Sequence, residues 1–283
     1  MKTAVFIGNR LPVWEVLSKQ GDIKINKAFV VARSPLAEVI KSSGVEFAII
    51  DDDTAAKKLV TEYLHHHKVD MVFSNGCPFV LPIAKLKDEH KETLFINTHP
   101  TYLPELKGKT PLNGVFYLGY DFIGATTHFM SDKVDEGNII FQKKISLTDD
   151  IDQGLIYYIS FELEAEVFEQ ALISLREASY KLPGTIQPGK GTYFNREQND
   201  FTIDFLVHSN EEIIKRVKSV GILKQGVSVQ LGEKLYKVFE ADEIVNPFLL
   251  AKFENYKPGS LLLDYSNKVL VKTIEGIIRF TYA

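Results

Sequence analysis

Short hydrophobic runs alternate with segments of helical periodicity through the first half of the chain. Five runs have the length and content of buried strands and lie at residues 4–7, 28–32, 47–50, 71–74 and 95–98. Pro12 and Pro35 stand where the first turns of the intervening helices are expected. Two further strands are predicted at residues 124–130 and 138–144. The alternation of strands and helices predicts a mostly parallel sheet covered by helices on both faces.

A long amphipathic helix is predicted after these strands. Asp150 and Gln153 have the spacing of a capping box in which an acid replaces Ser or Thr. Apolar residues then recur every four positions, at Leu155, Ile159, Leu163, Val167, Ala171 and Leu175. Such a stripe indicates a helix that buries one face.

The composition changes after Tyr180, where Pro-Gly pairs at 183–184 and 188–189 predict a linker. A helical stretch at 211–220 precedes β-rich runs, which lie at 227–231, 234–239, 260–263, 269–272 and 277–282. We therefore expect two domains, residues 1–190 and 191–283. The predicted fold class is α/β: a Rossmann-like open parallel-rich sheet with helices on both faces, followed by a small β-rich domain, an OB-like barrel or a meander.

The composition narrows the possible functions. With 283 residues, 45% of them hydrophobic, and a net charge of -4, the chain can bury a full core and shows no bias toward a polyanionic or membrane-surface partner. The single cysteine, Cys77, excludes an internal disulfide and fits a reducing cytoplasm. No stretch approaches the roughly 18 apolar residues of a membrane helix, and the first apolar run is too short for a signal peptide. We expect a cytoplasmic protein.

Polar side chains gather where two of the predicted strands end. Residues 97–100 read Asn-Thr-His-Pro, and residues 127–130 read Thr-His-Phe-Met ahead of Asp135. The carboxyl ends of strands are the usual place for chemistry in an open α/β sheet. Asn97 and His99 share one face of the strand, because side chains alternate with period two. An amide, an imidazole and a carboxylate, without a Ser or Cys nucleophile, suit acyl transfer between two bound substrates.

Each of these three groups has a role in such a reaction. The tetrahedral species bears an oxyanion, to which the Asn97 amide would donate a hydrogen bond. His99 would accept the proton of the attacking amine. Asp135 would hold the tautomer of that imidazole or relay a proton.

The order and spacing of several short motifs resemble the folate-dependent formyltransferases. These motifs are Asn97-x-His99-Pro100, Leu103-Pro104, the run from Lys107 to Lys109, residues 110–113, residues 124–128 and residues 134–137. The resemblance resumes at residues 192–196, at 202–205 and in the closing β-rich segment, which are similar to the second domain of the methionyl-tRNA and sugar enzymes. The family also includes the glycinamide ribonucleotide enzyme.

The resemblance implies that residues 1–190 form the catalytic domain and that N10-formyltetrahydrofolate is the co-substrate. It assigns the family's catalytic triad to Asn97, His99 and Asp135. It also implies a pterin pocket, formed by Phe79, Val80 and Leu81 together with a loop that includes Asp132 and Val134.

The acceptor amine is inferred from charge. Residues 193–283 contain 12 Lys and Arg and 12 Asp and Glu, a difference of zero, whereas tRNA binding favours a basic surface. A small anionic acceptor needs only a few cations, and the candidates are Arg10, Lys107, Lys109 and Arg196. Tyr193 and Phe194 could stack on a nucleotide base or merely anchor the linker. The nucleotide-sugar branch therefore fits best. The resemblance implies a 4-amino or 3-amino deoxysugar on dTDP, the commonest case in the family, whose formylated form serves bacterial surface polysaccharides such as lipopolysaccharide O-antigen.

Other functions remain open. Methionyl-tRNA formyltransferase has the same chemistry, and a formyltetrahydrofolate hydrolase would use water as the nucleophile, although hydrolases of this family carry a preceding regulatory domain. A non-catalytic folate-binding module is a third alternative. No compact ligand motif supports a metal site, and His128 is expected as a hydrogen-bonded core residue. A homodimer is expected from the resemblance alone.

Overall fold

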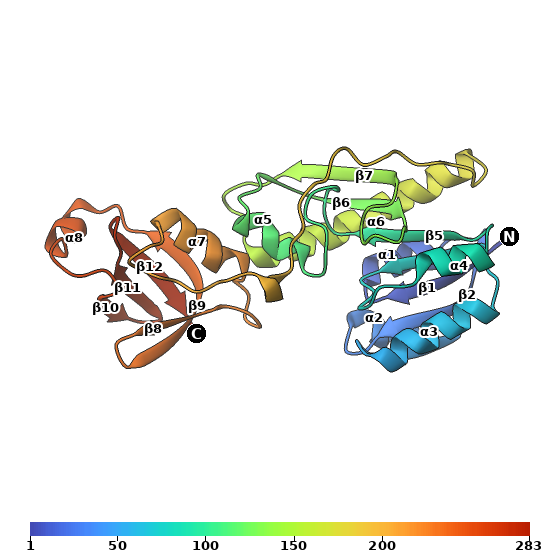
Figure 1. Ribbon diagram of the computed structural model, residues 1–283. Helices are drawn as coiled ribbons and strands as arrows, with labels where there is room; N and C mark the ends of the chain where they lie inside the picture. The colour runs from blue at the N-terminus through green and yellow to red at the C-terminus, as the bar shows by residue number, and fades with distance from the viewer. The chain divides into compact units, whose positions relative to one another are not determined.

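The computed structural model describes all 283 residues and divides into two compact units (Figure 1). Unit 1 comprises Met1–Lys109, Ile123–Ile145 and Tyr158–Tyr193, and unit 2 comprises Thr110–Phe122, Ser146–Tyr157 and Phe194–Ala283. The chain makes its last passage between the units close to the predicted boundary at residue 190. Unit 2 also takes in two earlier segments, which the division into residues 1–190 and 191–283 did not include.

Unit 1 is built on the seven-stranded sheet, in the order β3-β2-β1-β4-β5-β6-β7. The strands are β1 (Lys2–Gly8), β2 (Ile23–Val31), β3 (Phe47–Ile50), β4 (Met71–Asn75), β5 (Leu94–His99), β6 (Phe122–Phe129) and β7 (Ile139–Ser146). The first five strands pair in parallel, and β6 pairs antiparallel to β5. All seven strands match predicted runs, so the parallel-rich sheet is confirmed.

Helices cover both faces of this sheet, as expected. They are α1 (Leu11–Ser18), α2 (Pro35–Val39), α3 (Thr54–His66), α4 (Ile83–Glu89) and the long α6 (Gln153–Glu177), with a 3-10 turn at Ile40–Ser42. Phe6 of β1 lies in one apolar cluster with residues of α1, α2 and α6. Its neighbours Val5 and Ile7 lie in the opposite cluster with residues of α3 and α4. This alternation along β1 divides the core into two layers.

The start of α6 differs from the prediction. The helix begins at Gln153, and the side chain of Asp152 caps it. Asp152 Oδ1 accepts a hydrogen bond from the Leu155 backbone nitrogen at 2.8 Å. The capping box expected at Asp150 is therefore wrong, because Asp152 stands directly before the helix and satisfies its free backbone donors. Leu155, expected on the buried stripe, is 41% exposed.

Unit 2 contains an open antiparallel sheet of five strands in the order β10-β11-β12-β9-β8. The strands are β8 (Val227–Leu231), β9 (Lys234–Glu243), β10 (Leu261–Tyr265), β11 (Lys268–Lys272) and β12 (Ile277–Tyr282), and the helices are α5 (Gly114–Tyr117), α7 (Asn210–Ser219) and α8 (Pro247–Lys252). Apolar residues of α7 pack on one face of this sheet. The expected β-rich domain is confirmed as a half-barrel, because the sheet keeps two free edges rather than closing.

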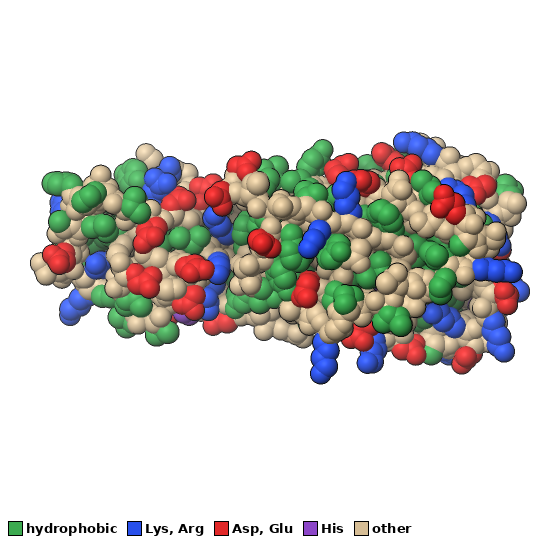
Figure 2. All heavy atoms as spheres, turned by 90° about the horizontal axis from the view of Figure 1, so that it is seen from above, with side chains coloured by type: hydrophobic (Ala, Val, Ile, Leu, Met, Phe, Trp, Pro, Cys, Tyr) green, Lys and Arg blue, Asp and Glu red, His purple; other side chains and the backbone are tan.

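The surface carries both signs of charge. Figure 2 shows Lys and Arg side chains interspersed with Asp and Glu on the visible face. None of the helices combines the length and the apolar content that a bilayer span requires.

One ion pair at the start of β4 makes a testable contribution to stability. The Asp70 carboxylate accepts hydrogen bonds from the Thr3 backbone nitrogen (2.8 Å), from Thr3 Oγ1 (2.8 Å) and from Lys2 Nζ (2.9 Å). Partial burial acts to raise the pKa of Asp70, but these hydrogen bonds outweigh it and lower the pKa to about 2. The stabilisation is therefore present above the unfolded-state pKa near 4 and is lost as pH falls toward 2.

We predict that Asp70→Asn lowers the free energy of unfolding at pH 7 by about 1 kcal/mol, a modest value because the pair is partly exposed. Urea unfolding should show the difference from wild type shrinking as pH falls from about 4 toward 2. Asp88→Asn, an exposed carboxylate in α4, is the matched control. A difference that is the same at every pH would contradict this account of Asp70.

Candidate active site

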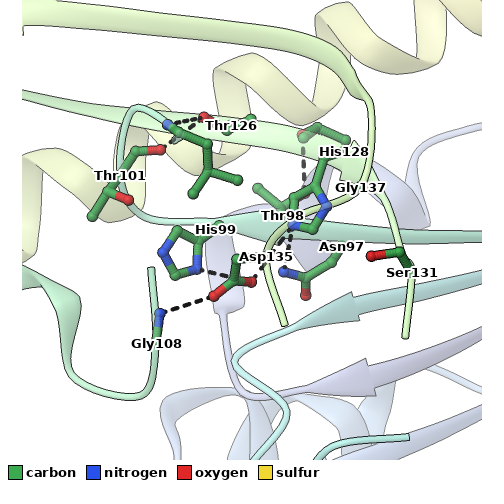
Figure 3. A network of polar contacts seen from close by, with 12 residues as sticks. Asn97, Thr98, His99, Thr101, Gly108, Thr126, His128, Ser131, Asp135 and Gly137 are labelled. Carbon is green, nitrogen blue, oxygen red and sulfur yellow. Dashed lines mark hydrogen bonds and ion pairs between the residues drawn. The ribbon is translucent and has the colours of Figure 1, made fainter. Parts of the chain in front are cut away.

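The two polar runs meet where β5 and β6 pair. Asn97 and His99 lie at the carboxyl end of β5, and the antiparallel pairing with β6 sets Asn97 opposite His128 (Figure 3). Asn97 Nδ2 lies 3.2 Å from His128 Nε2. The loop after β6 then brings Asp135 to the same place, within ion-pair distance of both imidazoles. The structure thus brings together the three residues predicted to react, and adds a second histidine.

His99 is buried and oriented by two oxygens. Its Nε2 lies 2.9 Å from the Leu106 carbonyl oxygen, and its Nδ1 lies 3.5 Å from Asp135 Oδ1. A carbonyl only accepts hydrogen bonds, so Nε2 carries the proton of the neutral ring and Nδ1 is the basic atom. Burial lowers the pKa of His99 below its ordinary value of 6.5, and the charge of Asp135 opposes that effect. His99 is therefore neutral at pH 7 and can accept a proton at Nδ1.

Asp135 is an enclosed carboxylate held in a left-handed backbone conformation, with φ of 56°. Its Oδ2 accepts a hydrogen bond from the Gly108 backbone nitrogen at 3.0 Å. Its Oδ1 lies 3.5 Å from His99 Nδ1 and 3.7 Å from His128 Nε2. Burial acts to raise the pKa of Asp135, but the positive charges that His99 and His128 carry once protonated hold it well below its usual range. The group stays ionised and stabilises a proton on His99.

His128 belongs to the site, although the sequence predicted only a packed core histidine. It is 2% exposed, and its Nδ1 lies 2.9 Å from the Phe129 carbonyl oxygen. Because Nδ1 donates to that carbonyl, Nε2 is free to accept from the Asn97 amide. His128 therefore fixes the orientation of the group predicted to bind the oxyanion. His128 is brought into the site by the register between β5 and β6. Hydrophobic periodicity along the sequence does not predict that register.

Gly137 and Gln187 fix the loop that carries Asp135. A Cβ added to Gly137 would overlap the Phe129 carbonyl oxygen, so only glycine allows the loop to lie this close to β6. Gln187 Nε2 donates to the carbonyl oxygens of Asp135 and Gly137, each at 2.8 Å. A segment from the end of unit 1 thus holds the acidic residue in place.

The two segments predicted to form the pterin pocket are linked by a hydrogen bond. Asp132 Oδ1 accepts from the Ala84 backbone nitrogen at 2.6 Å, which ties the loop after β6 to the first turn of α4. Val80 and Val134 are 54% and 44% exposed. Phe79 is partly buried, whereas Leu81 is 4% exposed and packs in the core. The Leu81 side chain therefore packs in the core beneath this surface and is not available to contact a ligand.

The predicted cationic residues of unit 1 already have carboxylate partners. Arg10 Nε lies 3.2 Å from Glu164 Oε2, and its guanidinium lies 3.8 Å above the Phe161 ring centroid. Lys107 is buried, with Nζ 3.3 Å from Glu136 Oε1, and half-exposed Lys109 pairs with Asp52. Tyr193 is 56% exposed, and its strand-like backbone forms a bridge with that of Lys107.

Phe194 and Arg196 belong to unit 2, and Phe194 corrects the prediction. Its ring is 1% exposed and packs against Tyr117, with 5.4 Å between ring centroids. A ring enclosed by protein cannot stack on a nucleotide base, so Phe194 instead anchors the segment after the linker. Arg196 begins a 3-10 turn (Arg196–Gln198), and its backbone nitrogen donates to Thr110 Oγ1 at 2.6 Å. No group of three or more His, Cys, Asp or Glu residues is arranged to hold a metal ion.

Solved structures share this fold. An N-formyltransferase from Helicobacter canadensis, in complex with folinic acid and dTDP-3-aminofucose, matches 100% of both chains with a TM-score of 0.72 and 14% identity. A sugar N-formyltransferase from a Shewanella species matches 87% of this chain and 100% of its own, with a TM-score of 0.66 and 17% identity. Phosphoribosylglycinamide formyltransferase from Anaplasma phagocytophilum matches 69% of this chain and 99% of its own, with a TM-score of 0.56 and 21% identity.

Sequence comparison adds relatives and a family. Methionyl-tRNA formyltransferase from Carboxydothermus hydrogenoformans is 28% identical over 182 residues, which are 64% of this chain and 56% of that protein. The enzyme of the same name from Prochlorococcus marinus is 26% identical over 213 residues, 69% and 64% of the two chains. The chain thus spans between half and two thirds of these relatives. The sequence profile of the formyl transferase family matches residues 12–172, more than half of the chain, and the protein therefore belongs to the formyl transferase family.

Proposed function

We propose that the protein transfers a formyl group from N10-formyltetrahydrofolate to the amine of a nucleotide-linked amino-deoxysugar. The observation that carries this proposal is the cluster at the end of β5 in which half-buried Asn97 lies beside buried His99 and Asp135. It supplies an oxyanion donor, a neutral base and a fixed anion, without a nucleophile of the protein's own. The Helicobacter canadensis neighbour, which matches the whole chain, was crystallised with a folate and a dTDP-aminosugar, and this supports the choice of both substrates.

The reaction follows from the positions of these groups. The acceptor amine attacks the formyl carbon, and the Asn97 amide donates to the developing oxyanion. His99 accepts the amine proton at Nδ1, where the Asp135 carboxylate stabilises the resulting imidazolium. The bond between the formyl carbon and N10 then breaks, and the departing nitrogen takes up the proton that His99 accepted, a transfer that Asp135 assists. One carbon–nitrogen bond forms and one breaks, with no oxidation or reduction.

The folate would lie on the region formed by Phe79, Val80 and the loop from Asp132 to Val134. The two exposed valines offer an apolar edge to a flat pterin ring. The hydrogen bond between Asp132 and the Ala84 nitrogen holds the two segments at a fixed separation. An apolar edge of fixed width fits the flat pterin ring of the folate donor.

A small anionic acceptor fits the charge distribution better than tRNA does. The β-rich part of the chain is neutral, with 12 basic and 12 acidic residues from 193 to 283, and Figure 2 shows no extended basic area on the visible face. Tyr193 remains the exposed aromatic candidate for stacking on a base. Formylated sugars of this kind would serve bacterial surface polysaccharides. The methionyl-tRNA relatives make tRNA the second candidate acceptor.

The proposed reaction depends on His99 and Asp135 for proton transfer. His99→Ala and Asp135→Asn should each lower kcat by a factor on the order of 100 or more, because each removes part of the proton-transfer apparatus. Formylated product is measured by chromatography, and circular dichroism establishes that each variant is folded. His66→Ala, an exposed histidine of α3, is the matched control. Near-wild-type rates in both site variants would refute the proposed reaction.

Burial and the charge of Asp135 act in opposite directions on the pKa of His99. Because burial lowers its pKa, the imidazole should titrate with a midpoint below 6.5, measured by NMR of the ring nitrogens. Asp135→Asn should lower the midpoint further, since the Asp135 charge favours the imidazolium. Asp88→Asn should leave it unchanged. A midpoint above 6.5 in wild type, or one that rises in Asp135→Asn, would contradict the assigned electrostatics.

Nucleotide binding tests the proposed acceptor. In a thermal-shift screen with a folate analogue present, one nucleoside diphosphate should raise the unfolding temperature selectively. Tyr193→Ala should lower the affinity for that nucleotide several-fold, which is the loss expected for one stacked ring. Tyr158 is also exposed, and Tyr158→Ala should leave this affinity unchanged. Tight, salt-sensitive binding of tRNA without any nucleotide response would replace the sugar acceptor by tRNA. Formate release without an amine would instead indicate a hydrolase.

A further inference from the structure

A second buried polar cluster lies behind the β5 strand end. Asn75, the last residue of β4, donates from Nδ2 to the Thr98 carbonyl oxygen at 2.9 Å and to Glu164 Oε1 at 2.7 Å. Glu164 lies on α6, and its Oε2 is 3.2 Å from Arg10 Nε. Arg10 is fixed in turn by the Asn9 side chain and the Phe161 ring. The proposed reaction uses none of these side chains.

The cluster continues the hydrogen bonding between β4 and β5 by one step beyond the end of their backbone pairing. The pairing of β4 with β5 ends at Ser74 and Asn97. The next carbonyl, that of Thr98, would lack a partner on the β4 side, and the Asn75 amide takes the place of the missing backbone donor. Thr98 stands between Asn97 and His99, so its peptide group sets the direction of both neighbouring side chains. A shift of this peptide would displace the oxyanion donor and the base together.

The cluster is unfavourable for stability alone. Asn75 is 1% exposed, and its Oδ1 is buried without a hydrogen-bond partner. The Glu164 side chain is fully buried, and burial raises its pKa to about 7 against the opposing charge of Arg10 and the hydrogen bond from Asn75. Replacing such groups by apolar residues is often neutral or stabilising. An unsatisfied amide beside a buried carboxyl therefore indicates a role in function rather than in folding.

We infer that Asn75 and Glu164 are positioning residues for formyl transfer: Glu164, oriented by Arg10, holds the Asn75 amide on the Thr98 carbonyl and so fixes Asn97 and His99. The inference rests on the function proposed above. The charged group that faces Glu164 is Arg10, from the loop before α1, and Asn75 faces it from β4. The charge of Arg10 also contributes to lowering the pKa of His99, so the two clusters are linked electrostatically as well.

Protonation of Glu164 would weaken this arrangement. The protonated acid gains an O–H donor, for which the unpartnered Asn75 Oδ1 is the available acceptor after the amide turns over. The turned amide no longer donates to Thr98. Activity should therefore increase as Glu164 ionises through pH 7, where its carboxylate pairs with Arg10.

Two variants and one control test the inference. Asn75→Leu removes both hydrogen bonds at nearly constant volume, and it should lower kcat at least tenfold with KM changed less than about threefold. Glu164→Gln carries a permanent amide in place of the titrating acid, and its kcat should no longer increase between pH 6 and pH 8. Glu166→Gln makes the same change on an exposed residue of α6 and should behave as wild type. If Asn75→Leu does not fold, Asn75→Ser takes its place with the same expectation.

A measurement independent of activity separates this inference from the proposed function. Hydrogen exchange, read by mass spectrometry on peptides covering β5, should be faster in Asn75→Leu than in wild type and Glu166→Gln. If wild type transfers no formyl group, the proposed function fails, and the exchange result still decides whether Asn75 holds the strand end. The inference is overturned if Asn75→Leu keeps kcat within twofold of wild type, if β5 exchange is unchanged, or if Glu164→Gln retains the wild-type pH profile.

Discussion

A carboxylate buried between two imidazoles governs the organisation of unit 1. An ion enclosed in this way is tolerated only when fixed partners replace the water that it has lost. Asp135 accepts a hydrogen bond from the Gly108 backbone nitrogen and lies within ion-pair distance of His99 and His128. The chain must bend sharply to deliver it, as its left-handed backbone shows. The close approach of Gly137 to β6 and the hydrogen bonds of Gln187 then hold that bend.

The sheet explains why these groups meet at one edge. The order β3-β2-β1-β4 means that successive connections run in opposite directions from β1, which places the topological switch point between the carboxyl ends of β1 and β4. Asn9 and Arg10 follow β1, and Asn75 ends β4. The pair Asn97 and His99 ends the next strand, β5. The antiparallel β6 then adds His128 from the opposite chain direction.

Hydrophobic patterning was sufficient to predict all seven strands of the large sheet and all five of the small one, because buried strands are short, apolar and bounded by turns. The common face of Asn97 and His99 followed from strand alternation alone. Contacts between segments distant in the sequence could not be predicted in this way. The register that pairs Asn97 with His128 and the contact of Arg10 with Glu164 depend on tertiary packing. Two local details also differ: Asp152 caps α6 in place of Asp150, and Phe194 turns inward, where it anchors the chain and cannot stack on a base.

The interleaving of the two units along the chain limits how the protein can be divided. Asn113, on the Thr110–Phe122 segment, is fully buried and donates to the carbonyl oxygen of Ser219 and to the Gln225 side chain. Gln153, in the first turn of α6, donates to the Leu112 carbonyl oxygen within the same unit. A fragment ending at the Pro-Gly linker would keep these early segments but lose the residues that enclose them. Genetic exchange of the C-terminal third would therefore have to supply new partners for an amide encoded more than a hundred positions upstream.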